Sequence, residues 1–567
     1  MGERPVARAV LLTLYSGQYP AIGESHGLSV VAGSLQATVM QSRLQMRVLD
    51  MVQWGEENPA RPVRAIHEVQ ANVLAIGLPY GTFSVLQKQF SVLRAALHGE
   101  DPLIVLGGPI ATYLSESLLR DVAPEAVIIL GEAEHVLPGL VERWLNHESF
   151  DDVPGIYYRD RLTGRAIHTP RRLADLSSAV LPFRGHVYDI RDHGGQIFAE
   201  ASRGCSWAAC TFCLRGLTDI SGRGQEYRRK NPSLVASDLF TLQSLGINDV
   251  TFADEDFLGS SAAEAGNFVD ALEASISSAP RFDASLTIHS VYSRRDSATD
   301  RLRRARTLEK LARMGLQKAF LGIESCSPSQ LGRYAKGHTR DEAATAVLLL
   351  QKLGIRVEIG VILFDPLCTL DEIEDSLRFM RDNGLATLAS GLSSSLRLQA
   401  GSHYLTMLRK YERRHQLELH STLLDPDTIS YPYIFLEASV QELHQSVEVW
   451  NRRLRPIYYP AKSLSRFGAT GALGDAAHSL RQATEQFRMA SCDAMLCAIS
   501  EMNRGKSAEL ALDQYFGEAG TSLASAILSS LSEMTSPAFT QHPVLQQALM
   551  EARRFRAHQV SKNVDQE

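Results

Sequence analysis

Short apolar runs alternate with helix-like segments through the first 150 residues of the chain. The runs that predict strands lie at 9–15, 46–51, 73–79, 103–109 and 126–132. Uniformly apolar strands separated by helices are typical of a parallel sheet that is covered on both faces. Residues 1–150 are therefore expected to form a doubly wound, flavodoxin-like α/β domain, in which a ligand would sit at the carboxyl ends of the strands.

The segments at the ends of four of these strands are rich in glycine, proline and small polar residues. They read LYSGQYP (14–20), GLPYGTF (77–83), LGGPIAT (106–112) and LGEAEH (130–135). A turn between a strand and a helix often contains glycine for purely conformational reasons. Four such loops on the same edge of one sheet nevertheless favour a ligand site there.

A second alternation of strands and helices begins after a hairpin and linker expected at 151–195. Strand-like runs lie at 196–205, 249–259, 285–292, 319–325, 356–366 and 394–402. Six βα repeats over residues 196–405 predict a partial, TIM-like (β/α)6 barrel. Thr339 and Glu342 form a capping-box pattern that predicts a helix start. Residues 406–567 have a helical pattern, and we expect a helical domain that caps the barrel and shapes the substrate pocket.

Composition excludes several classes of protein. The net charge of −6 does not predict a surface for nucleic acid or for anionic membranes. No run reaches the roughly 20 apolar residues that span a bilayer, and the N-terminus does not read as a signal peptide. Seven cysteines, an odd number in a chain of 567 residues, argue against a disulfide framework and favour the reducing cytoplasm.

Three of the seven cysteines lie close together in the segment ASRGCSWAACTFCLRG (201–216). Cys205, Cys210 and Cys213 follow the spacing C-x4-C-x2-C. Structural zinc would need a fourth ligand, a thiol–disulfide couple would leave Cys205 unexplained, and three inert buried cysteines are a further alternative. A 4Fe–4S cluster usually takes four thiolates, so three would leave one iron open to a substrate or cofactor.

This loop, placed after the first strand of the expected barrel, resembles the radical S-adenosylmethionine (radical SAM) superfamily. The family loop commonly reads C-x3-C-x2-C with an aromatic residue before the last cysteine, and Phe212 holds that place. The chain departs from the pattern by one extra residue between the first two cysteines. The resemblance implies that Cys205, Cys210 and Cys213 bind the 4Fe–4S cluster.

Two further segments support the resemblance. TFADEDF (251–257) looks like the family's acidic segment that contacts S-adenosylmethionine (SAM), although a cluster at a helix start is an alternative reading. LGIESCSPSQLGRYAKGHT (321–339) is similar to the fourth-strand segment. The resemblance therefore implies a SAM site formed by Phe212, Asp254, Glu255, Glu324 and Arg340.

The N-terminal unit resembles the cobalamin-binding domain that precedes the barrel in one branch of the superfamily. The resemblance implies cobalamin contacts from Tyr15, Pro79, Tyr80, Gly107, Gly108, Gly131 and Glu132. No D-x-H-x-x-G motif is present, and His26 reads as a helix-start residue, so cobalamin is expected base-off without a histidine ligand. A degenerate domain that binds no corrin is the alternative.

The resemblance implies a cobalamin-dependent radical SAM enzyme, and a C-methyltransferase is the first expectation. In such enzymes a 5′-deoxyadenosyl radical activates a carbon and methylcobalamin supplies the methyl group. The alternatives are a cyclase, a ring-contracting or an oxidative enzyme without net methylation, and a non-catalytic cobalamin or iron–sulfur sensor. We expect a small-molecule substrate and an electron donor such as flavodoxin or ferredoxin, with no nucleic acid and no stable membrane anchor.

Overall fold

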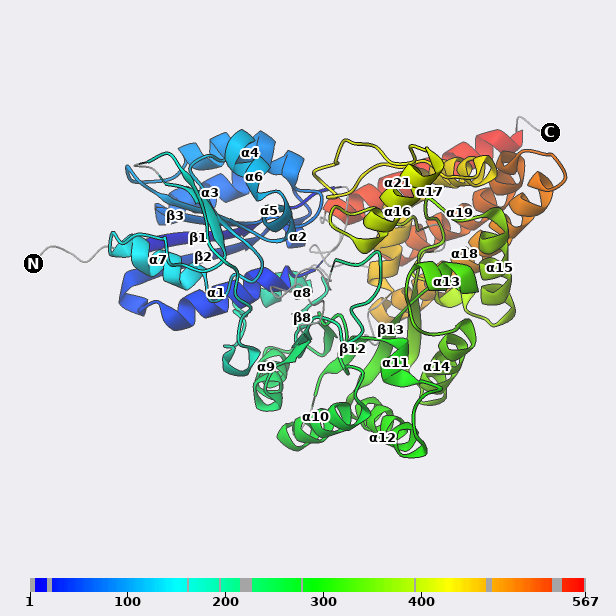
Figure 1. Ribbon diagram of the computed structural model, residues 1–567, viewed down its shortest axis with the longest axis horizontal. Helices are drawn as coiled ribbons and strands as arrows, with labels where there is room; N and C mark the ends of the chain where they lie inside the picture. The colour runs from blue at the N-terminus through cyan, green and yellow to red at the C-terminus, as the bar shows by residue number, and fades with distance from the viewer. Residues whose placement is uncertain are drawn as a thin grey trace, which may run out of the picture.

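A seven-stranded sheet forms the N-terminal part of the protein (Figure 1). The computed structural model describes residues 6–17, 23–160, 163–192, 195–214, 227–276, 279–391, 394–465, 472–532 and 543–564. The sheet has the order β2-β1-β3-β4-β5-β6-β7, and its first five strands are parallel, as predicted. These strands are β1 (Ala7–Thr13), β2 (Leu44–Asp50), β3 (Val73–Gly77), β4 (Leu103–Gly107) and β5 (Val127–Ile129).

Helices cover both faces of this sheet because successive strand residues point to opposite sides. One face packs against α1 (His26–Thr38) and α7 (Leu137–Leu145). The other face packs against α3 (Ala60–Val69), α4 (Phe83–Ala95) and α6 (Ser115–Asp121). The doubly wound α/β fold is thus confirmed.

The hairpin expected after residue 150 is present and continues the same sheet. Strands β6 (Ile156–Arg159) and β7 (Ala166–His168) pair antiparallel beyond β5. Ile156 and Tyr158 of β6 are buried, which accounts for their attachment to the edge of the sheet. The chain then passes through α8 (Val187–Asp192) toward the second sheet.

The second sheet contains five parallel strands in the order β14-β13-β12-β11-β8. They are β8 (Phe198–Ala199), β11 (Asp249–Phe252), β12 (Arg281–Leu286), β13 (Leu316–Glu324) and β14 (Arg356–Val361). In the described part of the chain β8 and β14 are its edge strands, so a closed barrel is not formed. The helices between the strands include α9 (Pro232–Ser244), α10 (Ala262–Ser275), α12 (Ala298–Met314), α14 (Arg340–Lys352) and α15 (Leu370–Asp382).

Two of the predicted strands of this region need correction. The sixth, at 394–402, makes only isolated bridges, from Ser395 to Phe364 and from Gln399 to Ser430, because its later residues bond to the segment around Ile429 and Tyr431 instead. The third, predicted at 285–292, instead begins at Arg281 and ends at Leu286, because Thr287 caps a short helix that takes up the rest of the predicted run. The capping box of Thr339 and Glu342 is present as predicted.

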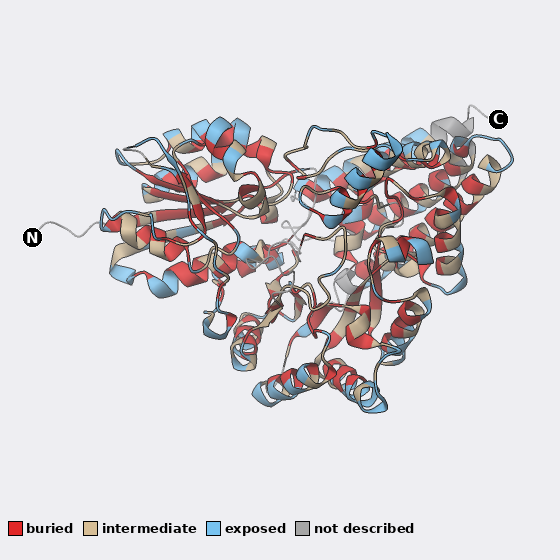
Figure 2. Cartoon of the chain, viewed as in Figure 1, coloured by how far each residue is buried: buried red, intermediate tan, exposed pale blue. Residues whose placement is uncertain are grey.

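Long helices form the C-terminal part of the protein, as expected. They are α17 (Ala438–Leu464), α18 (Ala472–Met502), α19 (Ala508–Ser532) and α21 (Pro543–Val564). They pack on one another and, through α18, on α15, with their buried residues facing inward (Figure 2). Among the described residues, no helix has the length and apolar character needed to cross a membrane.

A buried ion network joins the two sheets. The guanidinium of Arg184, in the linker, donates hydrogen bonds to Glu24 at 2.9 and 3.2 Å and to Asp238 at 2.7 and 3.0 Å. Glu24 follows β1 and Asp238 lies on α9, so one side chain links both domains. Arg184, Glu24 and Asp238 are each at most 7% exposed. Removing one member of such a network leaves a buried charge without its partner.

We expect Arg184→Met to destabilise the protein by on the order of 3–5 kcal/mol, because Glu24 and Asp238 lose their counter-charge in a buried site. The measurement is thermal unfolding together with limited proteolysis of the linker. Arg120→Met is the control, since Arg120 is 62% exposed and pairs with its exposed neighbour Asp121. A melting temperature equal to that of the wild type would contradict this role.

Asp254 connects the ends of β11 and β8. Its carboxylate accepts hydrogen bonds from the Ala201 N–H at 3.0 Å and the Ser202 hydroxyl at 2.5 Å. Burial raises its pKa to about 7, against the lowering effect of these two hydrogen bonds. A carboxyl whose pKa is raised by folding favours the native state at low pH and ceases to do so as pH rises through the folded pKa.

We therefore expect the wild type to lose stability between about pH 4 and pH 7 from this group, at on the order of 1.4 kcal/mol for each pH unit between its unfolded and folded pKa values. Asp254→Asn should flatten that slope because the side chain no longer ionises. Unfolding measured at several pH values tests this. Asp270→Asn, at a position that is exposed, is the control, and equal slopes in Asp254→Asn and the wild type would count against the assignment.

Candidate active site

A cavity of about 1120 Å³ lies between the carboxyl edges of the two sheets. One wall is formed by the loops after β3, β4 and β5 and by the start of α1. The opposite wall is formed by the cysteine loop and by the ends of β11, β13 and β14. The cavity exceeds the roughly 300–1,000 Å³ of ordinary small-molecule sites, so it has room for more than one ligand.

Six of the seven residues predicted for the cobalamin site line this cavity. They are Pro79, Tyr80, Gly107, Gly108, Gly131 and Glu132. Tyr15 does not line it: the residue is 5% exposed, and burial, with a smaller effect of Glu57, raises its pKa to about 12. Tyr15 therefore belongs to the core of the first domain.

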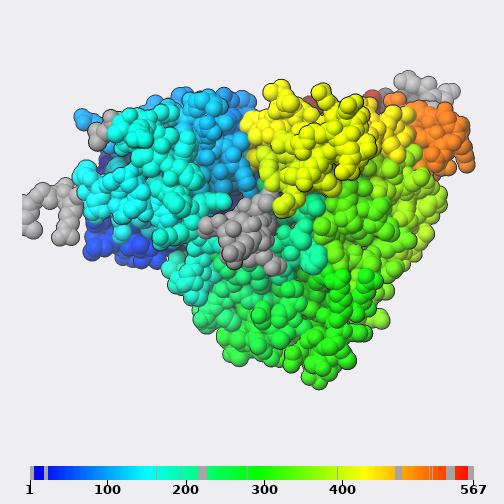
Figure 3. All heavy atoms as spheres, in the orientation of Figure 1, coloured from blue at the N-terminus to red at the C-terminus, as the bar shows by residue number. Residues whose placement is uncertain are grey.

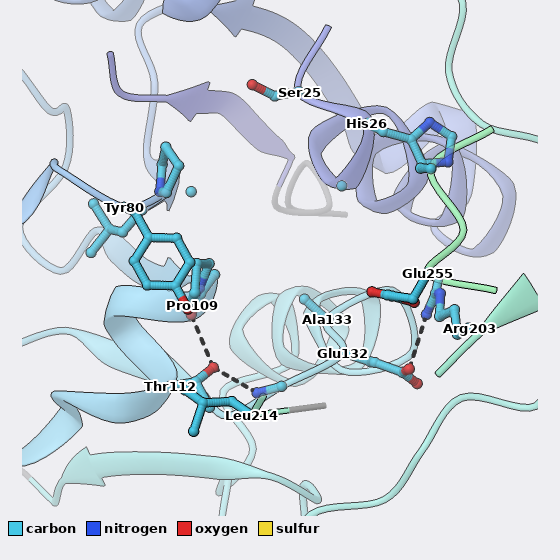
Figure 4. A pocket seen from close by; sticks show the side chains of 18 of the residues that line it. Ser25, His26, Tyr80, Pro109, Thr112, Glu132, Ala133, Arg203, Leu214 and Glu255 are labelled. Atoms are coloured by element: carbon cyan, nitrogen blue, oxygen red, sulfur yellow. Dashed lines mark hydrogen bonds and ion pairs between the residues drawn. The ribbon is translucent and has the colours of Figure 1, made fainter. Parts of the chain in front are cut away.

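Glycine is required at the loop after β4. Gly108 has a φ of 91°, and a Cβ there would lie 2.9 Å from the carbonyl oxygen of Leu78. The Thr112 hydroxyl donates to the Gly108 carbonyl and accepts from the Gly131 N–H, both at 2.9 Å (Figure 4). Gly107 faces open space. This wall thus presents backbone to the cavity and allows a flat ligand to approach closely.

Tyr80 is held from the second domain. Its hydroxyl accepts a hydrogen bond from Gln399 at 3.2 Å, and the guanidinium of Arg397 lies 5.7 Å from its ring centroid. Asp427 accepts a hydrogen bond from the Ser84 N–H at 3.0 Å, at the start of α4. The segment around Asp427 accordingly lies against the N-terminal domain (Figure 3).

The cysteine loop forms part of the opposite wall, with Cys205, Phe212 and Cys213 lining the cavity. Strands β9 (Ser202–Arg203) and β10 (Arg228–Arg229) pair at its base. The end of the quoted segment, from residue 215, lies outside the described residues. Burial raises the pKa of Cys210 to about 11, with Cys213, Glu324 and Cys205 adding to the rise and Lys336 opposing it. The three thiols are thus close enough to influence one another.

These thiols fit an iron–sulfur cluster better than a single metal ion. Within the described residues, no group of three His, Cys, Asp or Glu side chains converges closely enough to hold one ion. A 4Fe–4S cluster binds each thiolate through a different iron, so its ligands need not converge on one point. The donor set therefore fits the cluster, whose binding would displace the protons from the buried thiols.

The predicted SAM residues divide into two groups. Phe212, Glu255 and Glu324 line the cavity. Asp254 does not, because its carboxylate faces Ala201 and Ser202 at the end of β8. Arg340 also lies elsewhere: it starts α14 and pairs with Asp375 of α15 at 2.9 Å. These two side chains have structural partners outside the cavity.

Glu324 has an unusual backbone. Its φ of 70° lies in the left-handed region, which few residues with a Cβ adopt, and the pairing of β13 with β14 shifts register there. A Cβ on Gly322 would lie 2.7 Å from Glu324 Oε1, and one on Gly360 would lie 3.4 Å from Oε2. The carboxylate consequently rests on two glycines at the ends of the strands.

Sequence reasoning missed the charged residues between the domains. Arg203 pairs with Glu132 (Figure 4). It also contacts Glu134 and Glu200, and Arg228 pairs with Glu132. The sequence marked Glu132 within the loop LGEAEH, but its arginine partners lie about 70 to 100 residues away and only folding brings them together.

His26 was read only as a helix-start residue, and it does begin α1. It also lines the cavity, with a side chain that is 10% exposed. Among the described residues neither ring nitrogen has a hydrogen-bond partner, and a carboxylate oxygen of Glu24 lies 3.9 Å from Nδ1. A D-x-H search could not identify this position, because its location in the cavity depends on the fold.

The chain is similar in sequence to known proteins. The sequence profile of the Radical SAM superfamily matches residues 200–380. The 4′-phospho-dehydrooxetanocin synthase of Priestia megaterium is 23% identical over 490 residues, which cover 77% of this chain and 65% of the relative. The uncharacterized methyltransferase PH0819 of Pyrococcus horikoshii is 24% identical over 315 residues, or 53% of this chain and 62% of the relative. The matches thus span slightly less than two thirds of each relative's length.

Solved structures share the fold over most of the chain. OxsB, a cobalamin-dependent S-adenosylmethionine radical enzyme solved with aqua-cobalamin, superposes with a TM-score of 0.74 at 18% identity, covering 98% of this chain and 84% of OxsB. TsrM from Kitasatospora setae, a radical S-adenosylmethionine methyltransferase solved with cobalamin and a 4Fe–4S cluster, has a TM-score of 0.59 at 14% identity, covering 88% of this chain and all of TsrM. Residues 200–380 therefore match the radical SAM superfamily, and the chain as a whole shares the fold of OxsB and TsrM.

Proposed function

We propose that the protein is a radical SAM enzyme that uses cobalamin to modify a small molecule. The observation that carries this proposal is that one cavity joins a glycine-rich wall to the wall formed by the cysteine loop, which Cys205 and Cys213 line. A corrin and SAM must lie near each other for their chemistry to be combined, and the residues proposed for both sites line this one cavity. OxsB and TsrM, which share the fold, support the same pair of cofactors.

Cys205, Cys210 and Cys213 would hold the 4Fe–4S cluster, with SAM beside Phe212, Glu255 and Glu324. When bound, the cluster supplies one electron for reductive cleavage of SAM, and cobalamin supplies methyl or electron transfer. The chain itself orients these groups and limits water. Asp254 and Arg340 would act on the SAM site only through the elements that they connect.

Pro79, Tyr80, Gly107, Gly108, Gly131 and Glu132 would form the corrin side of the cavity. The exposed backbone around Gly107 suits a flat ring system, and Tyr80 is held in place by Gln399. The charge of Glu132 is already balanced by Arg203 and Arg228, so this residue would shape the site rather than bind a cation.

Within this class we propose C-methylation of an unactivated carbon as the first candidate reaction. The similarity to TsrM and PH0819, both named as methyltransferases, supports it. The second candidate is a ring contraction, cyclisation or oxidation without net methylation. It is favoured by the match to OxsB over 98% of the chain and by the sequence similarity to a dehydrooxetanocin synthase. An electron donor such as flavodoxin or ferredoxin would serve either reaction.

The C-terminal helices were expected to cap the substrate pocket. Among the described residues the cavity lining ends at Gln399, and α17 to α21 contribute no lining residue. In this position the helices would support the second sheet from its β14 side. Substrate contacts are instead proposed for the segment that follows α15, where Ser394, Ser395, Arg397 and Gln399 line the cavity.

Anaerobic reconstitution with iron, sulfide and hydroxocobalamin should give about four irons and one cobalt per chain. We expect Cys205→Ala, Cys210→Ala and Cys213→Ala each to lose most of the iron, because three thiolates hold the cluster. Cys497→Ala, on α18, is the control and should keep it. Iron without cobalt would remove the cobalamin part of the proposal, and zinc in place of iron would refute both parts.

Electron paramagnetic resonance (EPR) of bound cob(II)alamin tests the expected base-off state without a histidine ligand. His26 is the histidine that lines the cavity in the described structure, so it is the residue to replace. We expect no nitrogen hyperfine splitting in the wild type and the same spectrum in His26→Ala. A splitting that disappears in His26→Ala would show that the protein ligates cobalt through this residue.

The two candidate reactions differ in product mass. Incubation with SAM, a reductant and candidate small molecules should release 5′-deoxyadenosine in either case, and only methylation adds a CH2 unit to the substrate. Mass spectrometry with deuterated methyl-SAM distinguishes them. The Cys210→Ala variant supplies the background, and absence of 5′-deoxyadenosine from the loaded wild type would favour the non-catalytic sensor.

A further inference from the structure

The cysteine loop is seated on the segment that follows α13 (Pro328–Arg333). The indole N–H of Trp207 donates to the carbonyl of Ala335 at 2.9 Å. Thr211 donates to the carbonyl of Tyr334 through its backbone N–H at 3.1 Å. A Cβ on Gly337 would collide with the Trp207 ring at 2.2 Å. Residues 334–337 therefore form a close-fitting support for the loop, and Lys336 lies within it.

Lys336 is a buried cation on this support. Its side chain is 11% exposed, and Nζ lies 3.6 Å from Glu324 Oε1 and 5.9 Å from the ring centroid of Phe212. The backbone carbonyl of Lys336 contacts the ring of His289 at 3.2 Å. The ammonium group is thus placed between a predicted SAM residue and the cysteine loop.

The surroundings of Lys336 keep it charged despite its burial. Burial lowers its pKa, but Glu324, Cys210, Cys205 and Cys213 raise it, and the net effect is a rise. The influence is mutual, since Lys336 lowers the pKa of the Cys210 thiol. A buried charge of this kind persists only when opposite charges lie nearby.

A fixed positive charge beside a cluster favours its more negative, reduced form. The reduction potential of an iron–sulfur centre depends on net charge, hydrogen bonds to sulfur and solvent exposure. The low effective dielectric of a buried site strengthens this influence relative to water. Glu324 carries the opposite charge and partly cancels that of Lys336. Replacing each residue in turn therefore separates their contributions to the reduction potential.

We propose that Lys336 is a positioning residue that raises the reduction potential of the cluster held by the three cysteines and holds the Glu324 carboxylate against β13 and β14. This inference rests on the proposed function, because it requires the cluster. It goes further because it assigns a role in setting the reduction potential of the cluster to one residue, Lys336, that does not line the cavity. It also explains why Glu324 keeps its left-handed backbone: its carboxylate is fixed between two glycines and an ammonium group.

The test is an EPR-monitored redox titration of the reconstituted, full-length protein without substrate. Lys336→Met should shift the midpoint potential of the cluster to a more negative value at similar iron content. Lys336→Arg keeps the charge and should stay near the wild type. Glu324→Gln should shift the potential in the positive direction, because it removes a negative charge.

Lys318→Met is the matched control. Lys318 is a lysine of similar burial, 13% exposed, on β13, but it pairs with Asp283 and Glu358. We expect this variant to leave the midpoint potential unchanged. The control therefore distinguishes the effect of a charge near the cysteine loop from the effect of losing any buried lysine.

Equal midpoints in the wild type, Lys336→Met and Glu324→Gln would overturn the inference while leaving the proposed function intact. If Lys336→Met fails to retain iron, the shifts of Lys336→Gln and Glu324→Gln decide the question, and an unchanged potential in either overturns it. A wild type that binds no cluster would instead refute the proposed function itself.

Discussion

The buried contact of Arg184 with Glu24 and Asp238 sets the relation between the two sheets. Each carboxylate comes from a different domain, and the guanidinium between them also donates to the Phe198 carbonyl at 2.9 Å, at the first strand of the second sheet. Buried ions tolerate little displacement because separation leaves a charge unpaired in a low dielectric. The network therefore holds the carboxyl edges of both sheets toward one cavity, and the site depends on that arrangement.

A second layer of charges lies closer to the cavity. Arg203 and Arg228 of the second domain contact Glu132 and Glu134 of the first. Burial raises the pKa of Glu132, but the two arginines lower it by more than burial raises it. The net shift of the pKa is therefore downward, and the carboxylate stays ionised. These contacts place the loop after β5 directly opposite the base of the cysteine loop. Both walls of the cavity are in this way attached to each other by groups that also line it.

Much of the fold was predictable because strands of a parallel sheet that is buried on both faces appear in the sequence as continuous apolar runs. The apolar runs at 73–79 and 103–109 contain β3 and β4, and the pattern of Thr339 and Glu342 marks the start of α14. At 394–402 Leu396 and Leu398 alternate with polar residues, which is typical of a strand, but this alternation has another cause. Leu396 and Leu398 pack in a small core with Tyr404 and Leu408, outside the regular sheet.

The same limit applies to the C-terminal helices and to the acidic residues. The pattern of an amphipathic helix indicates that one face is buried, but it does not indicate which element covers that face. Tertiary contacts therefore decided that these helices lie on the α15 side rather than over the cavity. In the run Asp254-Glu255, one carboxylate points to the neighbouring strand end and the other reaches the cavity. Neighbouring residues of like type thus have different roles, because both lie in the loop that follows β11 and their side chains point in different directions there.

The sequence by itself determined the two α/β units, the three thiols of the candidate cluster and the glycine-rich edge of the first sheet. Each of these depends on local spacing or on the conformational freedom of glycine. Only the tertiary structure decided that the two edges share one cavity, that His26 faces it and that Lys336 lies beside the cysteine loop. Those features depend on contacts between residues far apart in the chain, such as Trp207 with Ala335 at a separation of 128 residues, which no local pattern can encode.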